Sequence, residues 1–160
     1  MNATHLHLLL NHVPVLGTVF GLVLLTFGMW RKSRDLQKAA LGVFVIVACL
    51  GVPAYLTGEP AEDGVENLPG VSEVFIEQHE SAASFAFTGI VALGVIGLFG
   101  LFLFRHGKPV STSFAVLMLM GSLSVSVLMA WTANLGGQIR HTEIRPNAAT
   151  PAVEQRKERD

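Results

Sequence analysis

Four long apolar segments constrain this chain more than any other feature. A helix needs roughly 20 apolar residues to cross the hydrocarbon core of a bilayer, and apolar segments of about that length occupy 6–30, 39–56, 82–104 and 111–135. Only 14% of the residues are charged and 51% are hydrophobic, so the chain is too apolar for an ordinary soluble domain of its size. We therefore expect an all-α integral membrane protein, with residues 1–141 forming a four-helix bundle of up-down-up-down topology.

The distribution of charge predicts how the bundle is oriented. Two connections are basic and contain Arg31, Lys32, Arg34, Lys38, Arg105 and Lys108. The remaining connection is acidic and contains Glu59, Glu62, Asp63, Glu66, Glu73, Glu77 and Glu80. Because basic connections are retained in the cytoplasm, we expect a multi-pass protein of the bacterial inner membrane with both termini in the periplasm. Residues 142–160 are expected to form a flexible C-terminal tail.

Histidines gather at the predicted periplasmic end. Three lie at the start of the first segment (His5, His7 and His12), one at the start of the third (His79) and one at the end of the fourth (His141). Measured from the basic end of each helix, the helical rise places His7 and His79 at similar heights, about 36 and 39 Å, and His12 about two turns deeper than His79. On a regular helix, His7 and His12 point about 140° apart.

Histidines from several helices at one depth indicate a cofactor, because ionisable groups at membrane depth are costly and usually functional. We predict a b-type haem, one or two per chain, held by histidines from different helices. His12 and His79 are the first choice of axial pair, and His7 and His141 are alternates or a second pair. Depth instead favours His7 with His79, and a bend at Pro14 would reconcile the two choices.

Other residues near the histidines suit a haem slot. The small residues Gly136 and Gly137 would let a flat group approach, and Arg140 would face the propionates. Copper is the second choice and zinc a weaker one, because methionine, cysteine and HExxH-type spacing are missing beside the histidines. Packing between helices also explains the small residues. Phe85 and Trp131 are more simply core aromatics than slot walls.

The single cysteine, Cys49, excludes a disulfide framework, a CxxCH haem attachment and a cysteine-rich metal cluster. Its position inside an apolar segment predicts a buried small residue.

HLHLLLNHVPVLG near the start and NLGGQIRHTEI near the end resemble the motifs HPxxVHFPIAL and GGxLVxxHG of uncharacterised bacterial four-helix membrane proteins. His7, His12 and Pro14 match the opening motif, whereas Val13 replaces its aromatic residue. Gly136, Gly137 and His141 approximate the closing motif, with a shorter spacing and no glycine after the histidine. Some members of this family are joined to Rieske-type iron–sulfur domains, which implies electron transfer.

The predicted function is electron transfer by a membrane-bound haem protein, more simply a non-catalytic subunit than an enzyme. Its expected partners are other subunits of a respiratory or photosynthetic membrane complex, a periplasmic electron carrier or the quinone pool, and no nucleic acid. Two other functions stay open: a non-redox structural subunit of a larger complex, and a periplasm-facing copper or zinc binding protein.

Overall fold

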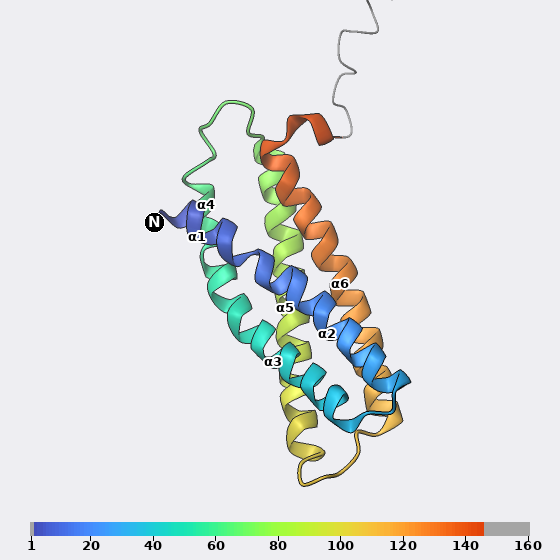
Figure 1. The fold of residues 1–160 in the computed structure, drawn as a ribbon. Helices are drawn as coiled ribbons and strands as arrows, with labels where there is room; N and C mark the ends of the chain where they lie inside the picture. The colour runs from blue at the N-terminus through green and yellow to red at the C-terminus, as the bar shows by residue number, and fades with distance from the viewer. Residues whose placement is uncertain (1, 146–160) are drawn as a thin grey trace, which may run out of the picture.

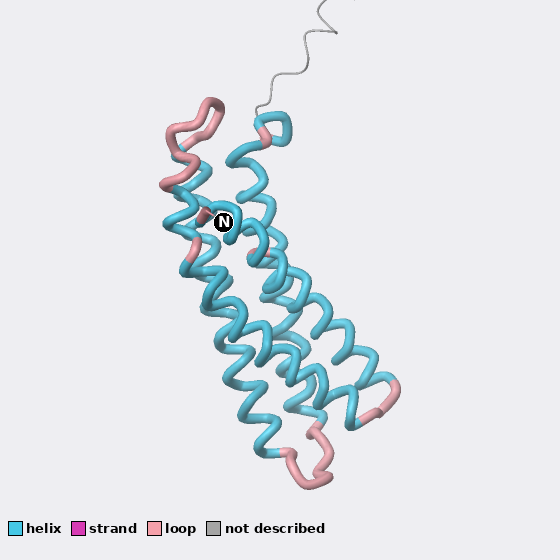
Figure 2. The backbone as a smooth tube through the Cα atoms, turned by 60° about the vertical axis from the view of Figure 1, so that its left-hand side comes forward, coloured by secondary structure: helices cyan, strands magenta, loops and turns pink. Residues whose placement is uncertain are grey.

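The computed structural model describes residues 2–145, so residue 1 and residues 146–160, most of the predicted tail, lie outside the described part. The elements are α1 (Ala3–Leu10), α2 (His12–Trp30), α3 (Arg34–Leu56), α4 (Gly58–Glu62), α5 (Glu73–Leu103), α6 (Thr112–Arg140) and the 3-10 helix η1 (Thr142–Ile144). Among residues 2–145 there is no strand (Figure 2), which confirms the all-α prediction.

Four helical stretches are long and apolar enough to cross a membrane. They are Ala3–Trp30, Arg34–Leu56, Glu73–Leu103 and Thr112–Arg140. The structure extends the predicted segments, because α5 begins at Glu73 rather than at residue 82 and α6 ends at Arg140 rather than at residue 135. Hydropathy marks the part of a helix that matches lipid, whereas backbone hydrogen bonding continues into the polar turns beyond it.

The four long helices pack in a ring in which α2 contacts α3 and α6, and α5 contacts the same two helices (Figure 1). The short connection after α2 and the connection after α5 lie at one end of the molecule, where an Arg34 guanidinium N–H donates to the carbonyl of Gly107 over 3.4 Å. The N-terminus, the segment after α4 and the end of α6 lie at the other end (Figure 1). This arrangement brings chain segments with histidines together.

The core is apolar and the outward surface is apolar as well. Its largest fully buried apolar side chains are Leu25, Leu41, Phe44, Ile90 and Met118. Large apolar side chains also point outward, including Leu16, which is 65% exposed, and Val127, which is also 65% exposed. A helix bundle with apolar residues both inside and outside is suited to a lipid environment rather than to water.

Cys49 is exposed, so the prediction that it is buried was wrong. Hydropathy identifies an apolar helix but not which of its faces points inward. The inward face of α3 carries Phe44, Val47 and Gly51, and Cys49 lies on another face.

Close packing of α3 on α5 depends on glycine. A Cβ atom added at Gly94 would overlap the Cβ atom of Ala48 and would lie 3.3 Å from the carbonyl oxygen of Phe44. Any side chain at residue 94 would therefore force the two helices apart. This contact is the helix-packing role that small residues were expected to have.

The first apolar segment is interrupted at Asn11, where α1 ends and α2 begins. Pro14 lacks a backbone N–H, so the carbonyl of Leu10 loses its helical partner, and the proline ring crowds that carbonyl. On the N-terminal side of this interruption, α1 packs against α4 and α3. The Thr4 hydroxyl donates to the carbonyl of Ala61 over 3.3 Å, which fixes α1 on α4.

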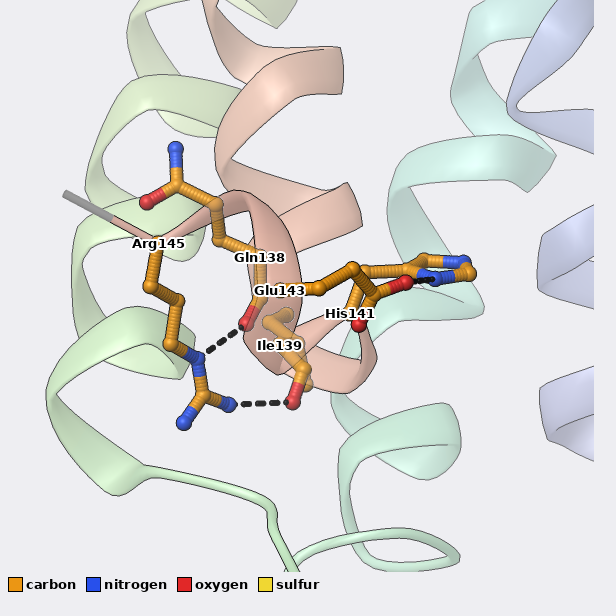
Figure 3. A network of polar contacts seen from close by, with 5 residues as sticks. All are labelled: Gln138, Ile139, His141, Glu143 and Arg145. Carbon is orange, nitrogen blue, oxygen red and sulfur yellow. Dashed lines mark hydrogen bonds and ion pairs between the residues drawn. The ribbon is translucent and has the colours of Figure 1, made fainter. Parts of the chain in front are cut away.

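The end of α6 is closed by Arg145, as Figure 3 shows. Its guanidinium donates to the carbonyl oxygens of Gln138, at 2.8 Å, and Ile139, at 3.0 Å, two of the acceptors that a helix end leaves without partners. It also donates to the carbonyl of Gly70 over 2.8 Å and lies 4.9 Å from the centroid of the Phe75 ring. Arg145 therefore joins the end of α6 to the connection before α5.

Candidate functional site

His7 is held by the end of α3. Its Nδ1 atom lies 3.0 Å from the carbonyl oxygen of Ala54 and 3.3 Å from the hydroxyl oxygen of Thr57. The Thr57 hydroxyl itself donates to the carbonyls of Pro53, at 2.9 Å, and Ala54, at 3.0 Å. Because a carbonyl oxygen only accepts, we assign the ring proton of His7 to Nδ1, and Nε2 keeps its lone pair.

His79 is held by α6 in the same manner. Its Nδ1 atom lies 3.0 Å from the carbonyl oxygen of Thr132, so we assign the proton to Nδ1 here too. The ring rests on Gly136: a Cβ atom at that residue would lie 3.0 Å from Cε1 and 3.1 Å from Nδ1 of His79. Glycine at residue 136 is therefore what allows the imidazole to reach the helix backbone.

The structure brings these two imidazoles together. The ring centroids of His7 and His79 are 6.5 Å apart, and the ring planes are inclined at 86°. The similar height that helical rise predicted for the two residues is thus confirmed. Both rings are partly buried, and both use Nδ1 on a backbone carbonyl, which leaves two Nε2 atoms as electron-pair donors at one end of the bundle.

His12, half of the first-choice pair, has a local partner. Its Nδ1 atom lies 2.8 Å from the carbonyl oxygen of Leu8, four residues earlier, at the interruption between α1 and α2. The side chain is exposed. Its Nδ1–H therefore satisfies a carbonyl of α1 near the point where Pro14 disturbs the helical hydrogen bonds.

The remaining histidines are exposed. His141 caps α6, and its Nδ1 lies 2.9 Å from a carboxylate oxygen of Glu143 (Figure 3). His5 and His106 are also exposed, and His106 lies in the basic connection at the opposite end. Arg140 is exposed in the last turn of α6, where a cation is favourable to the helix dipole.

Gly137, predicted with Gly136 to line a slot, faces a different neighbour. A Cβ atom at Gly137 would meet Cδ1 of Ile144 in η1 at 3.4 Å, which is ordinary contact. The two adjacent glycines therefore differ: one supports His79, and the other lies under η1.

Two carboxyl groups, Glu62 of α4 and Glu80 of α5, interact with each other. Burial, followed by hydrogen bonding and repulsion from Glu80, raises the pKa of Glu62 in α4 to about 7. Glu80 directly follows His79. The acidic connection is thus not uniformly ionised at neutral pH, because two carboxylates that share a hydrogen bond favour retention of one proton.

Sequence reasoning missed the backbone acceptors and an aromatic groove. Phe85 and Trp131, expected in the core, are 68% and 55% exposed and line a hollow on the outer side of α5 and α6. No residue pattern marks the carbonyls of Ala54 and Thr132 as histidine partners. Gly136, four residues before the end of α6, was the one available signal of a close approach.

Among residues 2–145, no group of three or more His, Cys, Asp or Glu side chains is arranged to hold a metal ion. In the comparisons with known proteins, no protein-family model, no curated protein and no solved structure matches the chain. The likeness to the four-helix membrane family stays at the level of its two short motifs.

Proposed function

We propose that this protein is a membrane-bound electron-transfer protein in which His7 and His79 hold one b-type haem near the periplasmic side. The observation that supports the proposal is the matched pair of imidazoles. Each is oriented by a hydrogen bond from Nδ1 to a backbone carbonyl, the outer-shell arrangement that fixes the tautomer of metal-binding histidines.

The separation of the rings would allow both imidazoles to hold one metal ion. The centroids of His7 and His79 are 6.5 Å apart. A second haem on His12 and His141 has no comparable support, because both side chains are exposed and bonded to neighbours in sequence.

A set of two imidazoles favours haem over the other metals. Haem iron takes four nitrogens from its porphyrin and requires only one or two further ligands from protein, so two imidazoles would suffice to hold it. Zinc and copper sites draw three or four ligands from side chains, and groups of that size are missing among residues 2–145. Copper and zinc therefore rank below haem.

The proposed placement in the bacterial inner membrane follows from the charges at the two ends. Arg31, Lys32, Arg34 and Lys38 lie at or beside the connection after α2, and Arg105 and Lys108 lie in the connection after α5. The acidic connection lies at the opposite end with the histidine pair. In an up-down-up-down bundle, retention of the basic connections in the cytoplasm places both termini in the periplasm.

Bound haem would supply a one-electron iron couple. The work of the chain is to orient His7 through the end of α3, to support His79 on Gly136, and to bury part of both rings. Arg140, exposed at the same end, is the proposed partner for propionates. We propose a non-catalytic subunit that exchanges electrons with a membrane complex or a periplasmic carrier.

The test is a dithionite-reduced minus oxidised visible spectrum of the purified, detergent-solubilised protein, together with a pyridine haemochrome assay. We expect b-type Soret and α bands at one haem per chain. His7→Ala and His79→Ala should each abolish them, whereas His12→Ala and His106→Ala should retain them. Far-UV circular dichroism of each variant controls for folding.

Two results contradict the proposal. A featureless spectrum from protein expressed with adequate haem supply would favour a structural subunit, and elemental analysis of that sample would reveal copper or zinc. Loss of haem in His12→Ala with retention in His7→Ala would instead restore His12 as the ligand.

A further inference from the structure

A hollow of about 400 Å³ opens on the outer side of the bundle between α5 and α6. Its lining residues are Glu77, Gln78, Ser81, Ala82, Phe85 and Trp131. We call this hollow the α5–α6 groove. Its volume lies within the range of about 300 to 1,000 Å³ that is usual for small-molecule sites. The haem pair described above uses none of these six side chains.

The half of the groove farther from the start of α5 is apolar and aromatic. Phe85 from α5 and Trp131 from α6 are 68% and 55% exposed, and Ala82, which also lines the groove, is 2% exposed. Two exposed rings that line one groove offer aromatic surface that a planar group can contact. Offset or edge contacts between aromatic rings contribute about 0.5 to 1.5 kcal/mol beyond the burial of their area.

The half of the groove nearer the start of α5 is polar. Glu77, Gln78 and Ser81 are all exposed. From Glu77 to Phe85 the chain advances eight residues along one helix, or about 12 Å. In the proposed membrane orientation, the polar half lies at the level of the headgroups and the aromatic half at the edge of the hydrocarbon. The groove therefore suits an amphiphile with a ring and a polar edge.

We propose that the α5–α6 groove binds the ring of a membrane quinone or quinol. A quinol ring carries hydroxyl donors that suit the carboxylate of Glu77 and the hydroxyl of Ser81. The amide of Gln78 both donates and accepts, so it can also bond the carbonyl of the oxidised ring. The planar ring contacts Phe85 and Trp131, and the isoprenoid tail continues into the lipid.

Charge separates this occupant from a phospholipid. The polar half of the groove carries the Glu77 carboxylate, and among residues 2–145 no lysine or arginine lines the groove. The headgroup of an anionic phospholipid would meet a like charge without a compensating cation, which is unfavourable. Phosphatidylethanolamine carries its own ammonium, so it is the lipid that competes with the quinone in the vesicles used below. A quinone headgroup is neutral in both stable redox states, so it incurs no such repulsion.

The groove adjoins the turn of α5 that carries the proposed haem ligand. Gln78 directly precedes His79, and Ala82 follows it by three residues. Electron exchange between quinol and haem rests on the proposed function, whereas occupancy of the groove does not. The experiment below can therefore support occupancy of the groove by quinone and refute haem binding, or the reverse.

Tryptophan fluorescence tests the occupancy directly, because the chain has two tryptophans. Trp30→Phe leaves Trp131 in the groove, and Trp131→Phe leaves Trp30, which is 74% exposed and lies at the end of α2. Each full-length variant is placed in phosphatidylethanolamine vesicles and titrated with a decyl-substituted benzoquinone. The quinone quenches tryptophan on contact, so Trp30 reports simple partitioning into the bilayer.

We expect saturable quenching of Trp131 and linear, unsaturated quenching of Trp30. Ser81→Leu in the Trp30→Phe background puts a larger side chain into the groove and should weaken the saturable component about tenfold, equivalent to about 1.4 kcal/mol. Ser84→Leu, at an exposed residue of α5 outside the groove lining, is the matched control and should leave the titration unchanged.

Equal, linear quenching of the two tryptophans would overturn the proposal and leave the groove to lipid. Saturable quenching that Ser81→Leu does not weaken would also overturn it, because the ligand would then bind elsewhere. The visible spectrum of the same samples reports haem independently. Specific quenching of Trp131 without haem would support the groove and refute the haem, and a haem spectrum without specific quenching would do the reverse.

Discussion

Gly136 and Gly137 are adjacent helical residues that differ in one contact, so their alanine variants test how His79 is held. A Cβ atom at residue 136 would lie 3.0 Å from Cε1 and 3.1 Å from Nδ1 of His79. At residue 137 the corresponding atom would lie 3.4 Å from Cδ1 of Ile144. Both substitutions remove the same backbone freedom from α6, and only Gly136→Ala pushes on the imidazole.

The magnitudes follow from these contacts. Alanine is favoured over glycine inside a helix by about 1 kcal/mol. Because carbon atoms prefer separations of about 3.5 to 4.0 Å, the His79 ring must shift by about 0.5 Å in Gly136→Ala. The hydrogen bond from Nδ1 to Thr132 is already 3.0 Å long, and lengthening it forfeits about 1 kcal/mol. We expect Gly137→Ala to raise the free energy of unfolding by about 1 kcal/mol and Gly136→Ala to leave it nearly unchanged.

The assay is equilibrium unfolding in detergent micelles, followed by far-UV circular dichroism, for both variants with His79 and with His79→Ala. Without the imidazole, Gly136→Ala should stabilise the protein as much as Gly137→Ala does. The coupling free energy between residues 79 and 136 should therefore be about 1 kcal/mol. Equal effects of the two alanines in the presence of His79, or a coupling below about 0.3 kcal/mol, would refute the contact.

Three further perturbations probe other contacts. Arg145→Ala removes the donor that joins α6 to the connection before α5, and should lower the free energy of unfolding by about 2 kcal/mol. Arg145→Lys should not restore the lost stability, because an ammonium cannot reproduce the fork of the guanidinium. Amide hydrogen exchange at the end of α6 should be faster in both variants than in the unaltered protein. The pKa of Glu62, raised from 4.5 to about 7 by burial and by Glu80, exceeds its value in the unfolded chain. Its stabilisation is therefore full below pH 4.5 and lost as the pH rises through 7, and a pH series of unfolding curves should flatten in Glu62→Gln. Gly94→Leu forces α3 away from α5 at Ala48 and should destabilise the bundle by about 1 to 3 kcal/mol or more, whereas Gly42→Leu, with nothing within 4 Å of its Cβ position, should have little effect in the same unfolding assay.

The fold was largely predictable because hydropathy and helix length are properties of contiguous sequence. Four apolar segments predicted four long helices, and the structure has them. The helix ends were less predictable. The turns from Glu73 to Ser81 contain three carboxylates and fall outside the apolar segment, yet they continue α5 because intrahelical hydrogen bonds do not require lipid. The inward faces were not predictable either, as the exposed Cys49 demonstrates.

The candidate site was only partly predictable. Counting residues along straight helices placed His7 and His79 at one height, and their rings are indeed neighbours. Counting did not reveal that His12 bonds to Leu8 within its own segment or that His141 pairs with Glu143 at the surface. Each of these histidines has several hydrogen-bond acceptors within reach of its ring, and helix spacing alone does not predict which acceptor it will use.

The sequence by itself determined the four helices, the acidic and basic ends, and the end at which histidines gather, because helical rise and hydropathy depend only on order along the chain. The tertiary structure decided which imidazoles meet. That choice depends on the packing of α1 against the end of α3, where His7 meets the Ala54 carbonyl, and on the missing side chain at Gly136, which lets His79 reach the Thr132 carbonyl. Rotation about a helix axis and contact across helices are set by packing, so only the folded chain specifies them.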